Sequence, residues 1–193
     1  EETNKQLDLC YRYRWHTSRA YGFVRTVDLA NTGQQDREIR IVDGIADILP
    51  SGIDARTQLN YSCLVDAYRL SELDSSKRLL VHRMAASLID EAVPLECLLA
   101  TTVWSVGWPE SDILLRLEDA HEYMKKPVKN PCAPPLRATP GAYFNAGQLH
   151  LPAGQSRQWA QVADVNRSQS EVAGLSKALE DPEALFRKAL EDI

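Results

Sequence analysis

The sequence predicts a mostly β globular domain with helical additions, and repeated alternation of apolar and polar residues is the main reason. Residues 7–15 alternate with a period of two and are rich in aromatics, which is typical of a β-strand. Residues 20–30 and 37–43 continue this pattern, and Asn31-Thr32-Gly33 between them is a turn signal. We therefore expect the second and third of these strands to form a hairpin.

The strand pattern is followed by a predicted loop and then by a predicted helix. Residues 43–54 are interrupted by Gly44, Pro50 and Gly52, which predicts a shaped loop. Residues 57–73 place apolar side chains at helical spacing. They predict one inserted helix that lies across a sheet face or along a sheet edge.

Two apolar segments follow. Residues 78–88 and 95–106 are apolar at nearly every position, so their periodicity alone does not separate strand from helix. The β-branched and aromatic run at 101–104 favours a strand for the second segment. Residues 113–115 predict another short strand, and the charged segment 116–126 predicts a short helix.

The C-terminal third contains the clearest local signals. Residues 127–140 hold five of the ten prolines, which predicts a loop or an extended connection. Residues 141–151 and 156–165 predict a final pair of strands. Ser168 to Glu171 forms a capping-box sequence, and Asp181-Pro182 begins a second helix.

Composition limits the classes of function. The 193 residues suit one domain, or one domain with a small appendage. The net charge of −5 argues against a nucleic-acid partner, because binding phosphates requires a basic face. No apolar run reaches 18 residues, so we expect no membrane span. The first residues lack Met and the last stop within an amphipathic pattern, so we expect a processed chain or a fragment.

Cysteine and histidine spacing gives no metal-binding pattern. No CxxC pair, HExxH or HxH sequence is present, so we predict no metal and no cofactor. We expect the four cysteines to be separate and mostly buried thiols, although their spacing leaves a disulfide open. His82 lies in an apolar segment, and we expect a core or edge histidine there.

Carboxylates gather in the predicted loop at 43–54. Asp43, Asp47 and Asp54 lie near its glycines. Paired carboxylates perform acid–base chemistry in glycoside hydrolysis, but Asp also caps turns by accepting hydrogen bonds from nearby backbone amides. Capping is the simpler interpretation of this cluster.

Tryptophan residues are the other candidates for binding, because aromatic rings can stack on sugar rings. Trp15, Trp104 and Trp159 lie in predicted strands, and we assign them to the core. Trp108 lies beside a turn and is the one tryptophan that we predict to contact a ligand. The sequence holds no Walker A, GxGxxG, GxSxG or kinase signature.

Several segments together resemble a known family. They are YGFVRTVDLANTG (21–33), IRIVDGIADILPSGI (39–53), LVDAYRLSELD (64–74), LATTVWSVG (99–107) and WAQVADVNRSQSEVAGL (159–175). In this order they resemble the N-terminal β-sandwich of the inverting glycoside phosphorylases and hydrolases typified by cellobiose phosphorylase. This super-sandwich has a galactose mutarotase-like fold. The DG…LPSG loop and the WxxVADV strand before a capped helix carry most of the resemblance.

The resemblance implies an antiparallel β-sandwich over residues 1–166, truncated at its N-terminus, and a helical linker over 167–193. In this family the linker leads to an (α/α)6 barrel that holds the catalytic residues, so it implies no catalytic residue here. The linker helices would pack their apolar stripes on that barrel. The implied function is a non-catalytic segment that supports the barrel, mediates a homodimer and meets carbohydrate only through the parent enzyme. Asp47 and Trp108 would then contact substrate at the rim of the active site.

Three alternatives remain at this stage. A stand-alone sugar-binding module would need exposed aromatics on one sheet face, and Trp108 with Tyr143 is the pair to check. An aldose-epimerase-like enzyme would need His82 or His150 to meet a carboxylate on a concave face. A purely structural or interaction protein is the third, because a fold alone does not determine function.

Overall fold

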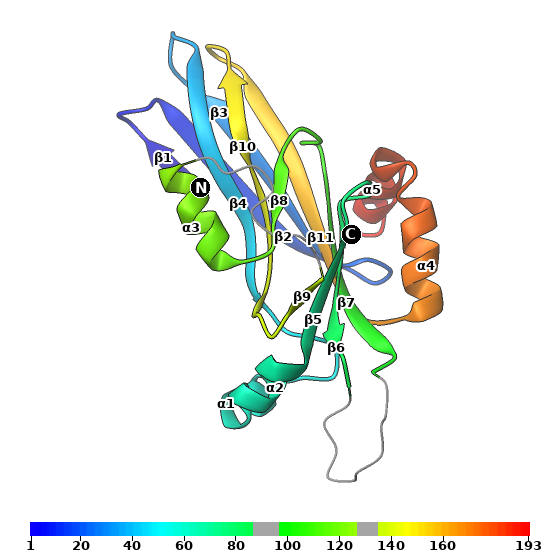
Figure 1. Ribbon diagram of the computed structural model, residues 1–193. Helices are drawn as coiled ribbons and strands as arrows, with labels where there is room; N and C mark the ends of the chain where they lie inside the picture. Colours follow the sequence, from blue (N-terminus) through cyan, green and yellow to red (C-terminus); the bar gives the residue numbers. More distant parts are fainter. Residues whose placement is uncertain (87–96, 127–134) are drawn as a thin grey trace.

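Antiparallel strands build most of the protein, as the computed structural model in Figure 1 shows. The structure describes residues 1–86, 97–126 and 135–193. The strands are β1 (Glu2–Asn4), β2 (Leu9–Ser18), β3 (Gly22–Asn31), β4 (Arg37–Ile48), β5 (Arg69–Asp74), β6 (Leu79–Met84), β7 (Leu99–Val106), β8 (Asp112–Leu114), β9 (Leu136–Arg137), β10 (Gly141–Leu151) and β11 (Ser156–Ser168). The helices are α1 (Ala55–Asn60), α2 (Ser62–Tyr68), α3 (Leu117–Lys125), α4 (Gln169–Ala178) and α5 (Pro182–Glu191).

The strands form two sheets that pack face to face. In the described residues, the larger sheet has eight strands in the order β1-β2-β3-β11-β7-β6-β5-β9, and the smaller has three in the order β4-β10-β8. The strand pairs in both sheets are antiparallel. The prediction of a mainly β protein with an antiparallel sandwich is therefore confirmed.

The core between the sheets is made by side chains that alternate inward from both of them. Val27 of β3 and Trp159 of β11 pack against Leu149 of β10. Further along the sandwich, Val103 of β7 packs against Tyr143 of β10. Burying such side chains contributes about 1.5–3 kcal/mol each, so these contacts hold the small sheet on the large one.

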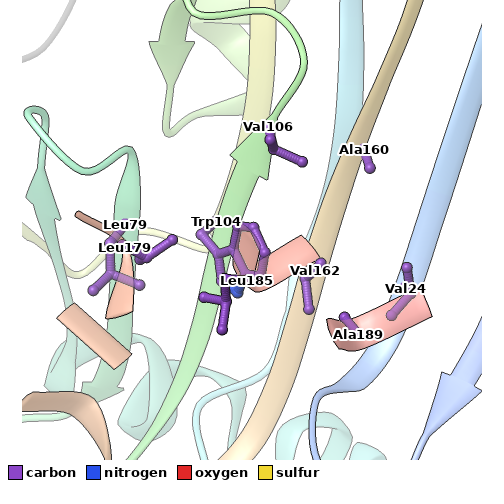
Figure 2. Close-up of a cluster of buried hydrophobic side chains, with 9 residues drawn as sticks. All are labelled: Val24, Leu79, Trp104, Val106, Ala160, Val162, Leu179, Leu185 and Ala189. Atoms are coloured by element: carbon purple, nitrogen blue, oxygen red, sulfur yellow. The ribbon is translucent and has the colours of Figure 1, made fainter. Parts of the chain in front are cut away.

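A second core lies on the outer face of the larger sheet, under α4 and α5 (Figures 1 and 2). Leu179, Leu185 and Ala189 of the helical segment are buried there against Trp104 and Val162 of the sheet. We expected these helices to pack their apolar stripes on another domain, and part of the stripes packs on the chain's own sheet instead. The outer face is apolar at Val24, Trp104 and Val162, which lie beneath these helices. Leu190 and Ile193 remain 43% and 50% exposed, so packing of the helices on a further domain stays a prediction.

Helix α3 covers the outer face of the smaller sheet, on the opposite side of the molecule from α4 and α5 (Figure 1). Its Ala120 and Tyr123 are buried against Phe144 and Ala146 of β10. The sandwich therefore carries a helical layer on each outer face.

The predicted loop at 43–54 is wrong in its first half. Strand β4 continues through Gly44 to Ile48 and pairs with β10. A Cβ at Gly44 would lie 2.1 Å from the carbonyl oxygen of Tyr143 and 2.6 Å from the Cα of Phe144. The glycine is therefore present because the neighbouring strand comes very close, and it does not mark a break in the strand.

The predicted helix at 57–73 is wrong in its second half. Two short helices, α1 and α2, end at Tyr68, and Arg69–Asp74 forms β5 against β6. The helices bury only Val65. The apolar periodicity therefore misled the prediction, because pairing with β6 outweighed local helical preference.

Two predicted strand pairings are wrong, because the strands concerned belong to different sheets. The predicted hairpin of 20–30 with 37–43 does not form, since β3 pairs with β2 and β11 whereas β4 pairs with β10. The predicted final pair, β10 and β11, is likewise divided between the two sheets.

The other elements agree with prediction within the described residues. The capping box of α4 forms between Ser168 and Glu171, and Asp181 caps α5. The segments 78–88 and 95–106 contain β6 and β7. Residues 87–96 and 127–134 of the predicted elements lie outside the described residues.

Cysteines are less buried than predicted. Cys10 is buried, Cys97 is half-buried and Cys63 is exposed, and all three are free thiols. Cys132 lies outside the described residues. In the part of the chain that the structure describes, no helix is long and apolar enough to cross a membrane, and no three His, Cys, Asp or Glu residues gather as metal ligands.

Candidate functional site

Trp108, the predicted ligand-binding tryptophan, lies in the core. It is 2% exposed, and its ring centroid lies 5.4 Å from that of Trp159. A Cβ at Gly147 would lie 2.6 Å from the indole, so this glycine makes room for the ring. Tyr143 is fully buried as well. Neither ring has a face free for a sugar, so the predicted Trp108–Tyr143 surface does not exist in this chain.

Asp47, the second predicted site residue, is exposed near the end of β4 with a φ of 55°. Its negative charge acts on Arg69 at the start of β5. The structure does not bring it to Trp108, which is buried between the sheets. A role for Asp47 at the rim of an active site stays a prediction.

The histidines do not form the constellation that an epimerase needs. His150 contacts Glu38 at 2.7 Å and Asp36 at 3.7 Å, but this is an exposed pairing across β4 and β10. His82 is fully buried, and its Nδ1 lies 2.8 Å from the hydroxyl of Ser71. The buried histidine thus contacts a serine, and the histidine with carboxylates is on the solvent-exposed surface.

Burial gives His82 a measurable effect on stability. Desolvation, helped by the charge of Arg69, lowers the pKa of His82 from 6.5 to about 4. The unfolded chain then binds the proton more tightly, so stability is lost as pH falls from 6.5 towards 4. We expect a loss of about 2 kcal/mol from this group at pH 5. Urea unfolding at pH 7 and pH 5 measures it, and His82→Gln should remove this part of the pH dependence.

The exposed His150→Gln variant is the matched control for that measurement. It should leave the difference in unfolding free energy between pH 7 and pH 5 close to that of the unmodified chain. An equal pH dependence in His82→Gln and the unmodified protein would contradict the assignment.

An exposed group of aromatic rings is the best candidate for a binding surface. Tyr13 and Trp15 of β2 and Phe23 of β3 are 43%, 49% and 49% exposed. The register pairs Trp15 with Arg25 and Thr17 with Phe23, which places all three rings on the face that looks towards the smaller sheet. We call these three residues the aromatic face. A shallow hollow of about 720 Å³ lies between Trp15, Phe23 and the C-terminal Ile193.

The aromatic face is exposed because the cover provided by the smaller sheet ends part-way along β2. Leu9 and Tyr11 in the first half of this strand pack against the smaller sheet, whereas Tyr13 and Trp15 further along it are exposed. We expected Trp15 to lie in the core, and that prediction is wrong, because its side chain is 49% exposed. The alternation of Tyr11, Tyr13 and Trp15 identified the shared face correctly, but nothing local shows where the covering sheet ends.

A buried ion pair supports the aromatic face from behind. The guanidinium of Arg25 lies 5.3 Å from the ring centroid of Tyr13 and 5.9 Å from that of Trp15. It donates hydrogen bonds of 2.8 and 2.7 Å to the two carboxylate oxygens of Asp43 on β4. Arg25 is therefore fixed between the rings and the smaller sheet, which orients the aromatic face.

Two further donors complete the environment of Asp43. The hydroxyl of Tyr11 and the indole Nε1 of Trp159 each donate to its carboxylate at 2.6 Å. Burial, together with the charge of Asp43, raises the pKa of Tyr11, so this phenol stays protonated and keeps donating. Asp43 thus joins β2, β3 and β11 to β4, a role that its sequence position among glycines did not reveal.

A search of protein-family descriptions found no match to this sequence, and a search of curated proteins found none either.

Proposed function

We propose that this chain is the non-catalytic β-sandwich segment of a larger carbohydrate-active enzyme, a glycoside phosphorylase or hydrolase, and that its aromatic face contacts the sugar. The exposed aromatic face is the observation that carries the proposal. Rigid aromatic rings offer a large apolar contact at low cost in conformational entropy, and the apolar faces of sugar rings are a suitable counterpart.

The state of Asp43 supports a non-catalytic role. It is the buried carboxylate nearest the aromatic face, and it accepts four hydrogen bonds, two of them from Arg25. A general acid or a nucleophile for glycoside chemistry must reach the scissile bond. Asp43 is instead committed to structure, so the chemistry belongs to another part of the parent enzyme, as the family resemblance implies.

A stand-alone sugar-binding module is the second candidate function, and the same aromatic face favours it. The two candidates differ in what surrounds this chain. Reading the gene on both sides of the segment separates them. Codons for a helical barrel after Ile193 support the first proposal, whereas a stop codon there contradicts it and leaves the binding module.

Replacing Trp15 with alanine should weaken sugar binding by about tenfold, because removing one stacked ring costs on the order of 1 kcal/mol or more. The measurement is an NMR titration of the 193-residue chain with cellohexaose and maltohexaose, followed through the indole N–H signal of Trp15 in the unmodified chain and backbone amides in the variant.

The matched control for this titration is Tyr61→Ala. Tyr61 is 60% exposed and lies between α1 and α2, away from the aromatic face. It should leave the affinity unchanged. Equal binding by Trp15→Ala and the unmodified chain would contradict a role for the aromatic face.

A further inference from the structure

A second cavity lies on the opposite face of β2 and β3 from the aromatic face. It is a cleft of about 440 Å³ between α5 and the outer face of the larger sheet. The sheet side includes Arg12 and Arg14 of β2 and Asp28 of β3, and the helix side includes Glu183 and Phe186. We call it the α5 cleft, and its volume is within the range of small-molecule sites.

On the sheet side of the α5 cleft, the pairing of β2, β3 and β11 brings three polar side chains next to one another. Arg12 lies opposite Asp28, and Asp28 lies opposite Gln158. The Nη1 of Arg12 is 3.7 Å from the carboxylate of Asp28, and the amide nitrogen of Gln158 is 3.4 Å from it. Both contacts are long, so Asp28 retains the capacity to accept hydrogen bonds from a ligand.

Unpaired charges of opposite sign also line the cleft. Arg14 lies beside these three polar side chains, and Glu183 lies in the first turn of α5. Neither forms an ion pair with another residue in the described ranges. Phe186 also lines the cleft and adds an apolar surface. The cleft therefore offers donors, acceptors and the ring of Phe186, and it is lined by two arginines and two carboxylates. The Nε of Arg12 already donates to Glu1 at 2.9 Å, which leaves the other nitrogens of its guanidinium for a ligand.

This balance of charge selects the class of ligand. Asp28 and Glu183 would repel an anion, and Arg12 and Arg14 would repel a cation. A neutral molecule with several hydroxyl groups can accept hydrogen bonds from the arginines and donate them to the carboxylates. The apolar face of its ring can contact Phe186. We propose that the α5 cleft binds a small neutral sugar, a mono- or disaccharide. This inference deepens the proposed carbohydrate role and rests on it.

Glu183→Gln tests the proposal without disturbing the core, because Glu183 is exposed. The probes are glucose, cellobiose, glucose 6-phosphate and glucosamine, titrated by NMR and followed at the backbone amides of α5. The unmodified chain should bind neutral cellobiose more tightly than either charged sugar. Glu183→Gln should weaken cellobiose binding about fivefold, since a charged acceptor is lost, and should strengthen glucose 6-phosphate binding about threefold.

Glu180→Gln is the matched control. Glu180 is exposed between α4 and α5 and does not line the cleft, so this variant removes the same charge and should leave both affinities within error of the unmodified chain. Unchanged affinities in Glu183→Gln, or a preference of the unmodified chain for a charged sugar, would overturn the proposal.

Trp15→Ala separates this inference from the proposed function. If cellobiose binding weakens in Glu183→Gln but is unchanged in Trp15→Ala, the α5 cleft is supported and the aromatic face is not. The reverse pattern overturns the α5 cleft and leaves the aromatic face as the sugar contact. Absence of binding by every probe overturns both.

Discussion

Asp43→Ala should lower the free energy of unfolding by about 3 to 5 kcal/mol, because it leaves the buried guanidinium of Arg25 without its counter-charge. The ion pair is 2.7 Å long and nearly inaccessible to solvent at both ends. The donors of Tyr11 and Trp159 lose their acceptor as well, and unsatisfied buried donors add to the cost. Urea unfolding at pH 7 measures this loss.

The double variant Arg25→Met/Asp43→Ala identifies the cause. Replacing the cation removes the uncompensated charge, so the double variant should be more stable than Asp43→Ala alone. Asp28→Ala, on the same strand as Arg25, is the matched control, and we expect a loss below about 1 kcal/mol because its ion pair is long and partly exposed. A double variant less stable than the single one would contradict this account.

Gly44→Ala should destabilise the protein by about 3 kcal/mol, at the upper end of what overpacking costs. The added Cβ would meet the backbone of β10 at Tyr143 and Phe144, at 2.1 and 2.6 Å. A backbone cannot rotate away as a side chain can, so β4 must move. Because Asp43 precedes Gly44, the movement should also loosen Arg25 behind the aromatic face.

Gly174→Ala is the control for Gly44→Ala, and we expect it to change stability in the opposite direction. Gly174 lies in α4, and a Cβ there would meet open space. Alanine is favoured over glycine in a helix interior by about 1 kcal/mol, so this variant should be more stable than the unmodified chain. Thermal unfolding of both variants checks the pair. A Gly44→Ala protein as stable as the unmodified one would contradict the close approach of β4 and β10.

Local sequence patterns determined a large part of this fold. Alternation over 7–15 and 20–30 corresponds to β2 and β3, and the capping sequence at Ser168 corresponds to the start of α4. These features depend on side-chain direction and on backbone amides within one turn, which neighbouring residues control. The prediction failed where a distant strand decided the outcome, as at Gly44 in β4 and at Arg69 in β5.

At the candidate site, too, the sequence determined the local arrangement and the tertiary structure determined which side chains are exposed. The sequence by itself placed Tyr13 and Trp15 on one face of one strand, but it assigned Trp15 to the core and Trp108 to a ligand. Only the tertiary structure shows that Trp108 is buried and Trp15 exposed, because burial depends on which surface a second sheet covers. The three-stranded sheet covers Trp108 and ends before Trp15. The α5 cleft likewise exists only because a helix from the end of the chain packs over strands from its beginning.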